Sequence, residues 1–148
     1  MLKHWGCRVF VMSRGGIHQQ LAAELGADWM GNAADRPPAS LDASILFAPA
    51  GDLVPAAMTA LDRGGILAIA GIYLSRISQL DYERDLFYEK ELRSVTANTR
   101  ADGEEFLRIA GDIPIKTSTV GLKLGEANRA LNMLKHDELR GAAVLHVS

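Results

Sequence analysis

Ser13 and Arg14 stand directly after an apolar run, Cys7–Met12, that predicts a β-strand. A hydroxyl donor and a planar guanidinium group both suit a phosphate. At the end of a strand, this pair could therefore bind a phosphate group. The alternative is an ordinary polar loop between a strand and a helix, and these residues alone do not decide between the two.

The other reactive side chains show no catalytic or metal-binding spacing. Cys7 is the single cysteine. Because it begins a predicted buried strand, we interpret it as a small apolar residue and not as a zinc ligand or nucleophile. The four histidines are scattered, and no Ser/His/Asp triad, P-loop or carboxylate pair is visible. We predict no catalytic residue and no metal site in this sequence.

The stretch Asp42–Ile72 predicts one strand–helix–strand unit. Ser44–Phe47 and Ile66–Ala70 are short apolar runs. The predicted helix between them repeats its apolar residues at helical spacing, and Gly64-Gly65 is expected to end it. Those apolar residues are Leu53, Ala56, Ala57, Ala60 and Leu61. Continuous apolar strands of this kind are typical of a parallel sheet covered on both faces.

In such sheets, ligands bind beyond the carboxyl ends of the strands. The segments Ala48–Gly51 and Gly71–Tyr73 follow the two predicted strands directly. We therefore expect a binding site to include both of them.

The rest of the chain continues the alternation of strands and helices. Further strands are predicted over Ala27–Gly31, Leu92–Thr99, Pro114–Val120 and Gly141–Val147. Further helices are predicted over Ile17–Leu25, from Arg100 to about Ala110 with Asp102 as N-cap, and over Leu124–Leu139. The last of these is predicted to be amphipathic, and its apolar face consists of Ala127, Ala130, Leu131 and Leu134. Met1–Trp5 predicts the last turn of a helix capped by Gly6, and Leu86–Leu92 is either extended or a helical turn. The pattern predicts an α/β fold with a doubly wound parallel sheet, in a single domain over 1–148.

Composition excludes several classes of function. The net charge is −2 with acidic and basic residues interspersed, so nothing suggests a nucleic-acid partner. No apolar run approaches the ~20 residues needed to span a bilayer. With one cysteine and no visible signal peptide, a cytoplasmic location is expected.

Four segments, taken in order, resemble one family. They are GADW at 26–29, the phrase FAPAGDLVPAAMTALDRGGILAIAGI at 47–72, ELRSVTANTR at 91–100, and LGEANRALNMLKHDELRGAAVL at 124–145. This set resembles the zinc-dependent alcohol dehydrogenases of the medium-chain dehydrogenase/reductase superfamily, over essentially the whole chain. The resemblance implies a Rossmann-like coenzyme-binding domain, followed by the strand that returns to the catalytic domain.

The resemblance is to the C-terminal portion of that family only. The family's zinc ligands belong to a catalytic domain with no counterpart here, and its glycine-rich phosphate loop would precede Met1. We therefore expect the sheet to lack its first, central strand, leaving an unpaired slot between Cys7–Met12 and Ser44–Phe47. A partner chain could fill the slot, the strands could close up, or the chain could be a truncated gene product.

The resemblance also implies a coenzyme site. Ser13 and Arg14 stand where NAD-dependent members carry an acidic residue, which favours NADP over NAD. Ala48–Ala50 would line the adenosine side, Ala70–Ile72 and Ser94–Thr96 would border the nicotinamide, and Arg140 would reach the pyrophosphate. The full implied set is Ser13, Arg14, His18, Ala48, Pro49, Ala50, Ala70, Gly71, Ile72, Val95 and Arg140. The alternatives are a strand terminator at Ala48–Ala50 and a solvated helix-end cation at Arg140.

Two functions follow, from different classes. The first is the coenzyme-binding portion of an oxidoreductase that transfers hydride between NADP(H) and an alcohol or aldehyde. This portion is expected to be inactive alone, because the zinc is held by the absent catalytic domain. A zinc-free quinone or enoyl reductase is a close variant. The second is a non-catalytic remnant or assembly module, a homo-oligomer formed through Leu86–Thr99. The charged run Asp81–Glu91 is interpreted as a solvated face with apolar anchors, or by resemblance as part of a subunit contact.

Overall fold

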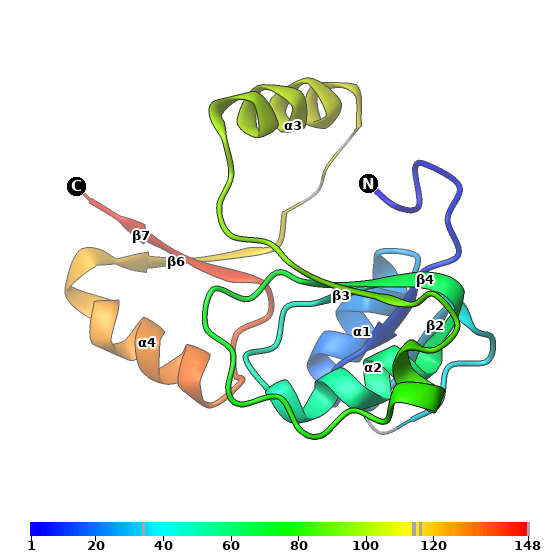
Figure 1. The fold of residues 1–148 in the computed structure, drawn as a ribbon. Helices are drawn as coiled ribbons and strands as arrows, with labels where there is room; N and C mark the ends of the chain where they lie inside the picture. The colour runs from blue at the N-terminus through cyan, green and yellow to red at the C-terminus, as the bar shows by residue number, and fades with distance from the viewer. Residues whose placement is uncertain (34, 114, 116, 148) are drawn as a thin grey trace. The chain divides into compact units, whose positions relative to one another are not determined.

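The computed structural model describes residues 1–33, 35–113, 115 and 117–147 of the chain. Strands and helices alternate along it, as the sequence predicts (Figure 1). The chain forms two compact units: Met1–Asn32 together with Glu105–Ser148, and Ala33–Glu104. Each unit is described by itself below.

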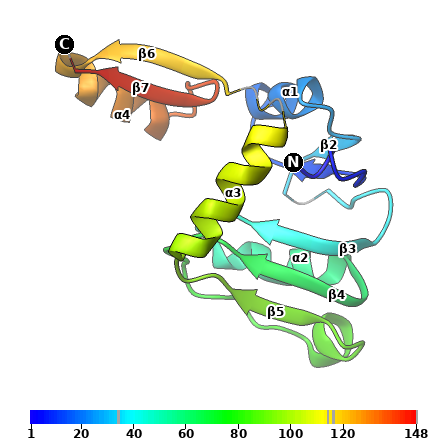
Figure 2. The same ribbon diagram turned by 90° about the horizontal axis from the view of Figure 1, so that it is seen from above.

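The unit Ala33–Glu104 is built on a parallel sheet. Its strands are β3 (Leu41–Leu46), β4 (Leu61–Ile69) and β5 (Glu91–Ser94), in the order β3-β4-β5. Figure 2 shows their arrows side by side and pointing the same way. The crossover between β3 and β4 contains one 3₁₀ turn, Gly51–Leu53, and the helix α2 (Val54–Ala60). The α/β class with parallel strands is therefore confirmed.

The core of this unit lies between α2 and the sheet. Val54 and Met58 are fully buried and pack with Leu61, Leu67 and Ile69. The predicted apolar face is confirmed at Leu61 and Ala57, which belong to or pack on this core, and is wrong at Ala56, which is exposed. The fully buried positions of the helix are Val54 and Met58, which the prediction did not include. Burying valine and methionine removes more apolar surface from water than burying alanines would.

The helix also ends earlier than the glycine pair suggests. Ala60 is the last residue of α2, and Leu61 is already extended with φ −70° and ψ 146°. Gly64 and Gly65 lie inside β4, near a register irregularity between Leu41 and Ala43 of β3. The two glycines therefore lie in the irregular first part of β4, and the prediction that they end the helix is wrong.

A buried carboxylate joins the charged run to this core. Asp85 lies in a π-helical turn, Tyr82–Leu86, and its side chain is fully buried. Its two oxygens accept hydrogen bonds from Arg84 Nε and Nη2, both at 2.7 Å. They also accept from the Thr59 hydroxyl of α2 at 3.1 Å and from the Asp81 amide at 2.9 Å. The interpretation of 81–91 as a solvated face is therefore wrong at Asp85.

The unit Met1–Asn32 with Glu105–Ser148 contains two pairs of parallel strands. β1 (Phe10–Met12) pairs with β2 (Trp29–Gly31), and the helix α1 (Gly16–Glu24) connects them. The Phe10 and Trp29 rings meet edge to face, with centroids 6.1 Å apart. β6 (Thr119–Lys123) pairs with β7 (Ala142–His146). The helix α4 (Ala127–Lys135) connects this second pair and lies along one of its faces, as Figure 2 shows.

Among the described residues, β1 pairs with β2 and β3 pairs with β4, in separate sheets. No ladder therefore joins the predicted strands Cys7–Met12 and Ser44–Phe47. β1 itself begins only at Phe10, and Cys7 is exposed, so the expectation of a buried cysteine is wrong. Just before β1, the Val9 amide donates to the Asp28 carboxylate at 2.7 Å, and the Asp28 amide donates to the Val9 carbonyl at 2.8 Å.

Local hydrogen bonds fix where the N-terminal turn ends and where the helix after Thr99 begins. The Gly6 cap is confirmed: its φ is 78°, and the Cys7 amide donates to the Leu2 carbonyl at 3.1 Å. The helix α3 (Arg100–Asp112) begins after Thr99, whose hydroxyl accepts from the Asp102 amide while Asp102 accepts from the Thr99 amide. Thr99 is thus the N-cap and Asp102 closes a capping box, which corrects the prediction of Asp102 as N-cap.

The face of α4 is also different from the prediction. Ala130 is buried and Met133 half-buried, whereas Leu131 and Leu134 are 63% and 61% exposed. The prediction placed both leucines on the buried face with Ala127 and Ala130. The helix is shorter than 124–139, because a 3₁₀ turn, Leu124–Glu126, precedes it and the helix ends at Lys135.

β6 starts at Thr119, later than the predicted start at Pro114; Pro114 and Lys116 lie outside the described residues. β5 ends at Ser94 and not at Thr99. None of the helices in the described part of the chain is long and apolar enough to cross a membrane.

The Asp85 cluster gives a first prediction. Asp85→Asn should lower the free energy of unfolding by about 2 kcal/mol, because it leaves the Arg84 guanidinium without its charged partner. The control is Glu83→Gln, an exposed carboxylate on the same turn, which should leave stability within about 0.5 kcal/mol. Urea unfolding of both variants measures the difference.

The same difference should depend on pH. The Arg84 hydrogen bonds hold the pKa of Asp85 below its usual 3.8, against the opposing effect of burial. Because the pKa of Asp85 is lower in the folded chain than in the unfolded chain, its ionised carboxylate stabilises the fold fully at a pH above the unfolded-state pKa. This stabilisation is lost as the pH falls through the folded-state pKa. The difference in the free energy of unfolding between the unmutated chain and Asp85→Asn should therefore become smaller below about pH 4. A gap that stays constant down to pH 2 would contradict this assignment.

Candidate functional site

The carboxyl ends of β3, β4 and β5 lie at one edge of their sheet. Leu46 is in register with Ile69, and Ile69 with Ser94. The ladder continues one step past the strands, since the Ala70 amide donates to the Leu46 carbonyl and the Val95 amide to the Ile69 carbonyl, both at 3.0 Å. The structure thus brings together the segments 48–50, 70–72 and Val95. Their role as coenzyme contacts stays a prediction.

This edge exposes apolar side chains. Ile72 is 99% exposed and Phe47 72%, and Tyr73 and Val95 are exposed as well. Large apolar groups gathered at the carboxyl edge of parallel strands are typical of a site that buries a flat or apolar ligand. The edge can therefore supply apolar contact, with backbone groups of the loops as the polar partners.

The loop that follows β4 fixes one side of this edge. The Gly51 amide donates to the Ser75 hydroxyl at 2.8 Å, and the Ser75 amide donates to the Pro49 carbonyl at 3.3 Å. A Cβ on Gly51 would lie 2.4 Å from the Ser75 carbonyl oxygen and 2.5 Å from that of Arg76. Only glycine permits this approach, so the segment 49–51 is held in place by backbone packing.

This close approach gives a second prediction. Gly51→Ala should lower the free energy of unfolding by at least about 2 kcal/mol, because backbone carbonyls cannot move aside as a flexible side chain can. The matched control is Gly103→Ala in α3, where nothing lies within 4 Å of the added methyl. That change should be neutral or stabilising by up to about 1 kcal/mol. Chemical denaturation of the two variants tests the contrast, and equal stabilities would refute it.

Ser13, Arg14 and His18 surround the start of α1 in the other unit. Ser13 follows β1 directly, Arg14 is exposed, and Gly15 caps the helix. His18 is half-buried in the first turn. A hydroxyl, a guanidinium and an imidazole thus stand beside the N-terminus of a helix, where backbone amides and the helix dipole favour an anion.

Arg140 is not part of this group. It forms an ion pair with Glu24, the last residue of α1. Glu24 and Gly16 are the two ends of a nine-residue helix, which separates them by about 12 Å along its axis. The structure therefore places Arg140 at the end of α1 that is opposite Ser13 and Arg14.

Gln19 belongs to the Ser13 region, and the sequence analysis did not identify it. Its side-chain Nε2 donates to the Ser13 carbonyl at 2.9 Å and to Asn32 Oδ1 at 3.2 Å. No sequence signal could have singled it out, because a glutamine six residues after Ser13, in a surface helix, carries no motif.

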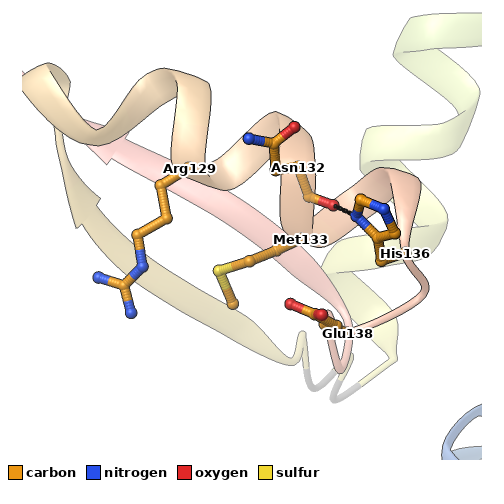
Figure 3. A pocket seen from close by; sticks show the side chains of 5 residues that line it. All are labelled: Arg129, Asn132, Met133, His136 and Glu138. Carbon is orange, nitrogen blue, oxygen red and sulfur yellow. Dashed lines mark hydrogen bonds between the residues drawn. The ribbon is translucent and has the colours of Figure 1, made fainter.

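A separate open hollow of about 570 Å³ lies beside α4. Figure 3 shows its lining, Arg129, Asn132, Met133, His136 and Glu138, all from α4 or the turn after it. His136 Nδ1 is 2.8 Å from the Asn132 carbonyl oxygen, and Arg129 is paired with Glu126. None of the predicted site residues lines this hollow.

The described residues bring no three His, Cys, Asp or Glu side chains close enough together to hold a metal ion. This donor set therefore does not fit a zinc ion.

Comparison with known proteins adds the family relationship. No protein-family model matches the chain. The probable alcohol dehydrogenase AdhA of Mycobacterium tuberculosis (strain CDC 1551 / Oshkosh) is 53% identical over 140 residues, which are 95% of this chain and 40% of that protein. The chain thus spans less than half the length of this relative.

Solved structures show the same partial coverage. The alcohol dehydrogenase of the hyperthermophilic archaeon Aeropyrum pernix superimposes with a TM-score of 0.85 at 22% identity, over 99% of this chain and 45% of that one. A cinnamyl alcohol dehydrogenase (SbCAD4) of Sorghum bicolor superimposes with a TM-score of 0.84 at 22% identity, over 97% of this chain and 42% of that one. At this identity the two structures establish the fold, which is Rossmann-like.

Proposed function

We propose that the chain is a C-terminal, coenzyme-binding portion of an NADP(H)-linked alcohol dehydrogenase. The observation that carries the proposal is the 53% identity to AdhA over 95% of the chain.

The carboxyl edge of β3, β4 and β5 binds the ring portions of the coenzyme. The small side chains of Ala48 and Ala50 allow a flat adenine to approach, and the exposed Ile72 and Val95 offer apolar contact beside the nicotinamide. The backbone at 70–72 orients the carboxamide. The nicotinamide itself supplies the hydride when it is bound.

Ser13 and Arg14 select the phosphorylated coenzyme. An NAD site places a carboxylate at the end of this strand, and a carboxylate repels the 2′-phosphate of NADP. A hydroxyl and a guanidinium attract the 2′-phosphate, because both donate hydrogen bonds and the guanidinium is positively charged. His18 contributes a further contact from the first turn of α1.

The chain's own residues orient the coenzyme and do not complete the reaction. The chain spans 40% of the length of AdhA. We therefore propose that turnover needs groups from the rest of such a protein, and that the chain by itself is inactive.

Titration with NADPH and NADH, followed by nicotinamide fluorescence, tests the proposal. The unmutated chain should bind NADPH more tightly than NADH. Arg14→Gln should weaken NADPH binding roughly 10- to 100-fold and leave NADH binding nearly unchanged, because only the first coenzyme presents a phosphate to this side chain.

The control is Arg108→Gln, an exposed arginine of α3, which should change neither affinity. Failure to bind either coenzyme would refute the proposed function. An equal loss for both coenzymes would refute the role of Arg14 in selection.

A second candidate function is an assembly module, and one observation favours it. β5 is the edge strand of its sheet, so the outward backbone groups of this strand can pair with another strand. Because the Val95 amide faces β4, the Ser94 amide faces outward in a parallel ladder. A second copy of the chain could pair there, within the segment Leu86–Thr99.

Ser94→Pro tests this candidate. Proline removes the outward amide without removing a hydrogen bond to β4, so it should convert a dimer to a monomer. Ser94→Ala keeps the amide and should leave the mass in solution unchanged. A chain that is monomeric without mutation, or a proline variant that stays dimeric, would rule out assembly through this edge.

A further inference from the structure

Both backbone groups of Ser13 are held by neighbours in the same unit. The Ser13 amide donates to the Gly31 carbonyl at 2.9 Å, at the end of β2. The Ser13 carbonyl accepts from Gln19 Nε2 at 2.9 Å, and this bond is partly buried. Gln19 Nε2 also donates to Asn32 Oδ1 at 3.2 Å. One side-chain amide thus joins the end of β1, the start of α1 and the residue that follows β2.

The chemistry leaves one orientation for this amide. A carbonyl oxygen can only accept, so the Gln19 atom that faces Ser13 must be the nitrogen. The same nitrogen carries a second proton, and the oxygen of Asn32 is the matching acceptor. The backbone amide of Gln19 donates to the Gly15 carbonyl at 3.4 Å, so Gln19 closes the loop 13–19 through both its backbone and its side chain.

This arrangement determines how Arg14 leaves the strand. With its amide and its carbonyl both bonded, Ser13 has little freedom in φ and ψ. The course of the chain into Arg14 follows from those two angles, and the Ser13 hydroxyl lies 3.4 Å from the Arg14 carbonyl oxygen, to which it donates. Arg14 is exposed, and its long side chain loses rotamer freedom when it binds a ligand, so a prepositioned backbone lowers the cost of binding.

The bond has an electrostatic effect as well. The Ser13 carbonyl oxygen accepts from Gln19 Nε2, so its partial negative charge is matched by a donor of the chain itself. Without that bond the peptide could rotate and present a partial negative charge to the phosphate. Such a change would weaken binding of a 2′-phosphate more than binding of a 2′-hydroxyl.

We propose that Gln19 is a positioning residue that sets the preference between NADPH and NADH, by holding the Ser13–Arg14 backbone through its side-chain amide. The inference rests on the proposed coenzyme site. It assigns to Gln19 no contact with the coenzyme itself.

Gln19→Met tests the proposal, because methionine keeps the length and linear shape of glutamine and removes the donor. NADPH affinity should fall about tenfold while NADH affinity changes less than about threefold, so the ratio of the two dissociation constants shifts. The matched control is Gln20→Met, the neighbouring exposed glutamine of the same helix, which should leave both constants unchanged. Thermal unfolding midpoints confirm that both variants are folded.

A merely structural role would weaken both coenzymes equally, so an unchanged NADPH/NADH ratio in Gln19→Met overturns the proposal. An unmutated chain that binds neither coenzyme overturns the proposed function, and the selectivity role of Gln19 with it. A chain that prefers NADPH while Gln19→Met keeps the preference overturns only the role of Gln19.

One measurement on the unmutated chain is independent of coenzyme. ¹⁵N relaxation of the side-chain amides should show Gln19 as rigid and Gln20 as mobile on the ps–ns timescale. Equal mobility of the two amides would overturn the positioning role whatever the coenzyme binding shows.

Discussion

The buried Asp85 carboxylate is the constraint on which the unit Ala33–Glu104 depends. A charge removed from water must be matched by donors, and here Arg84, Thr59 and the Asp81 amide supply them. Thr59 lies on α2, so the bonds join the turn 82–86 to the helix that covers the sheet. Lys90 adds a bond from its ammonium group to the Met58 carbonyl at 2.9 Å, immediately before β5 begins.

The geometry of the candidate site at the carboxyl edge of β3, β4 and β5 depends on this packing. α2 and the turn 82–86 pack beside this sheet, and the register of β4 with β5 brings Ala70 and Val95 to the same edge. The Ser75 contacts then hold the segment 49–51 from the other side. In the unit Met1–Asn32 with Glu105–Ser148, the side-chain amide of Gln19 connects three segments by hydrogen bonds. Both sites thus consist of loops whose positions are set by hydrogen bonds to backbone groups.

Local sequence patterns predicted the elements well and their faces poorly. Gly6 and the alternation of strands and helices were predicted correctly, because caps and apolar periodicity act over a few neighbouring residues. The inward faces of α2 and α4 were not, since Ala56 and Leu134 are exposed. Which face a helix buries depends on the shape of the sheet it meets, and the sequence of the helix alone does not contain that shape.

The sequence by itself determined the α/β class, the segments that end the strands, and the donors Ser13 and Arg14, because these follow from residue type and spacing. Only the tertiary structure decided that Asp85 is buried, that Arg140 pairs with Glu24, and that Gln19 holds Ser13. The physical reason is distance along the chain. Glu24 and Arg140 are 116 residues apart, and a contact of that kind exists only once the strands and helices between them have packed.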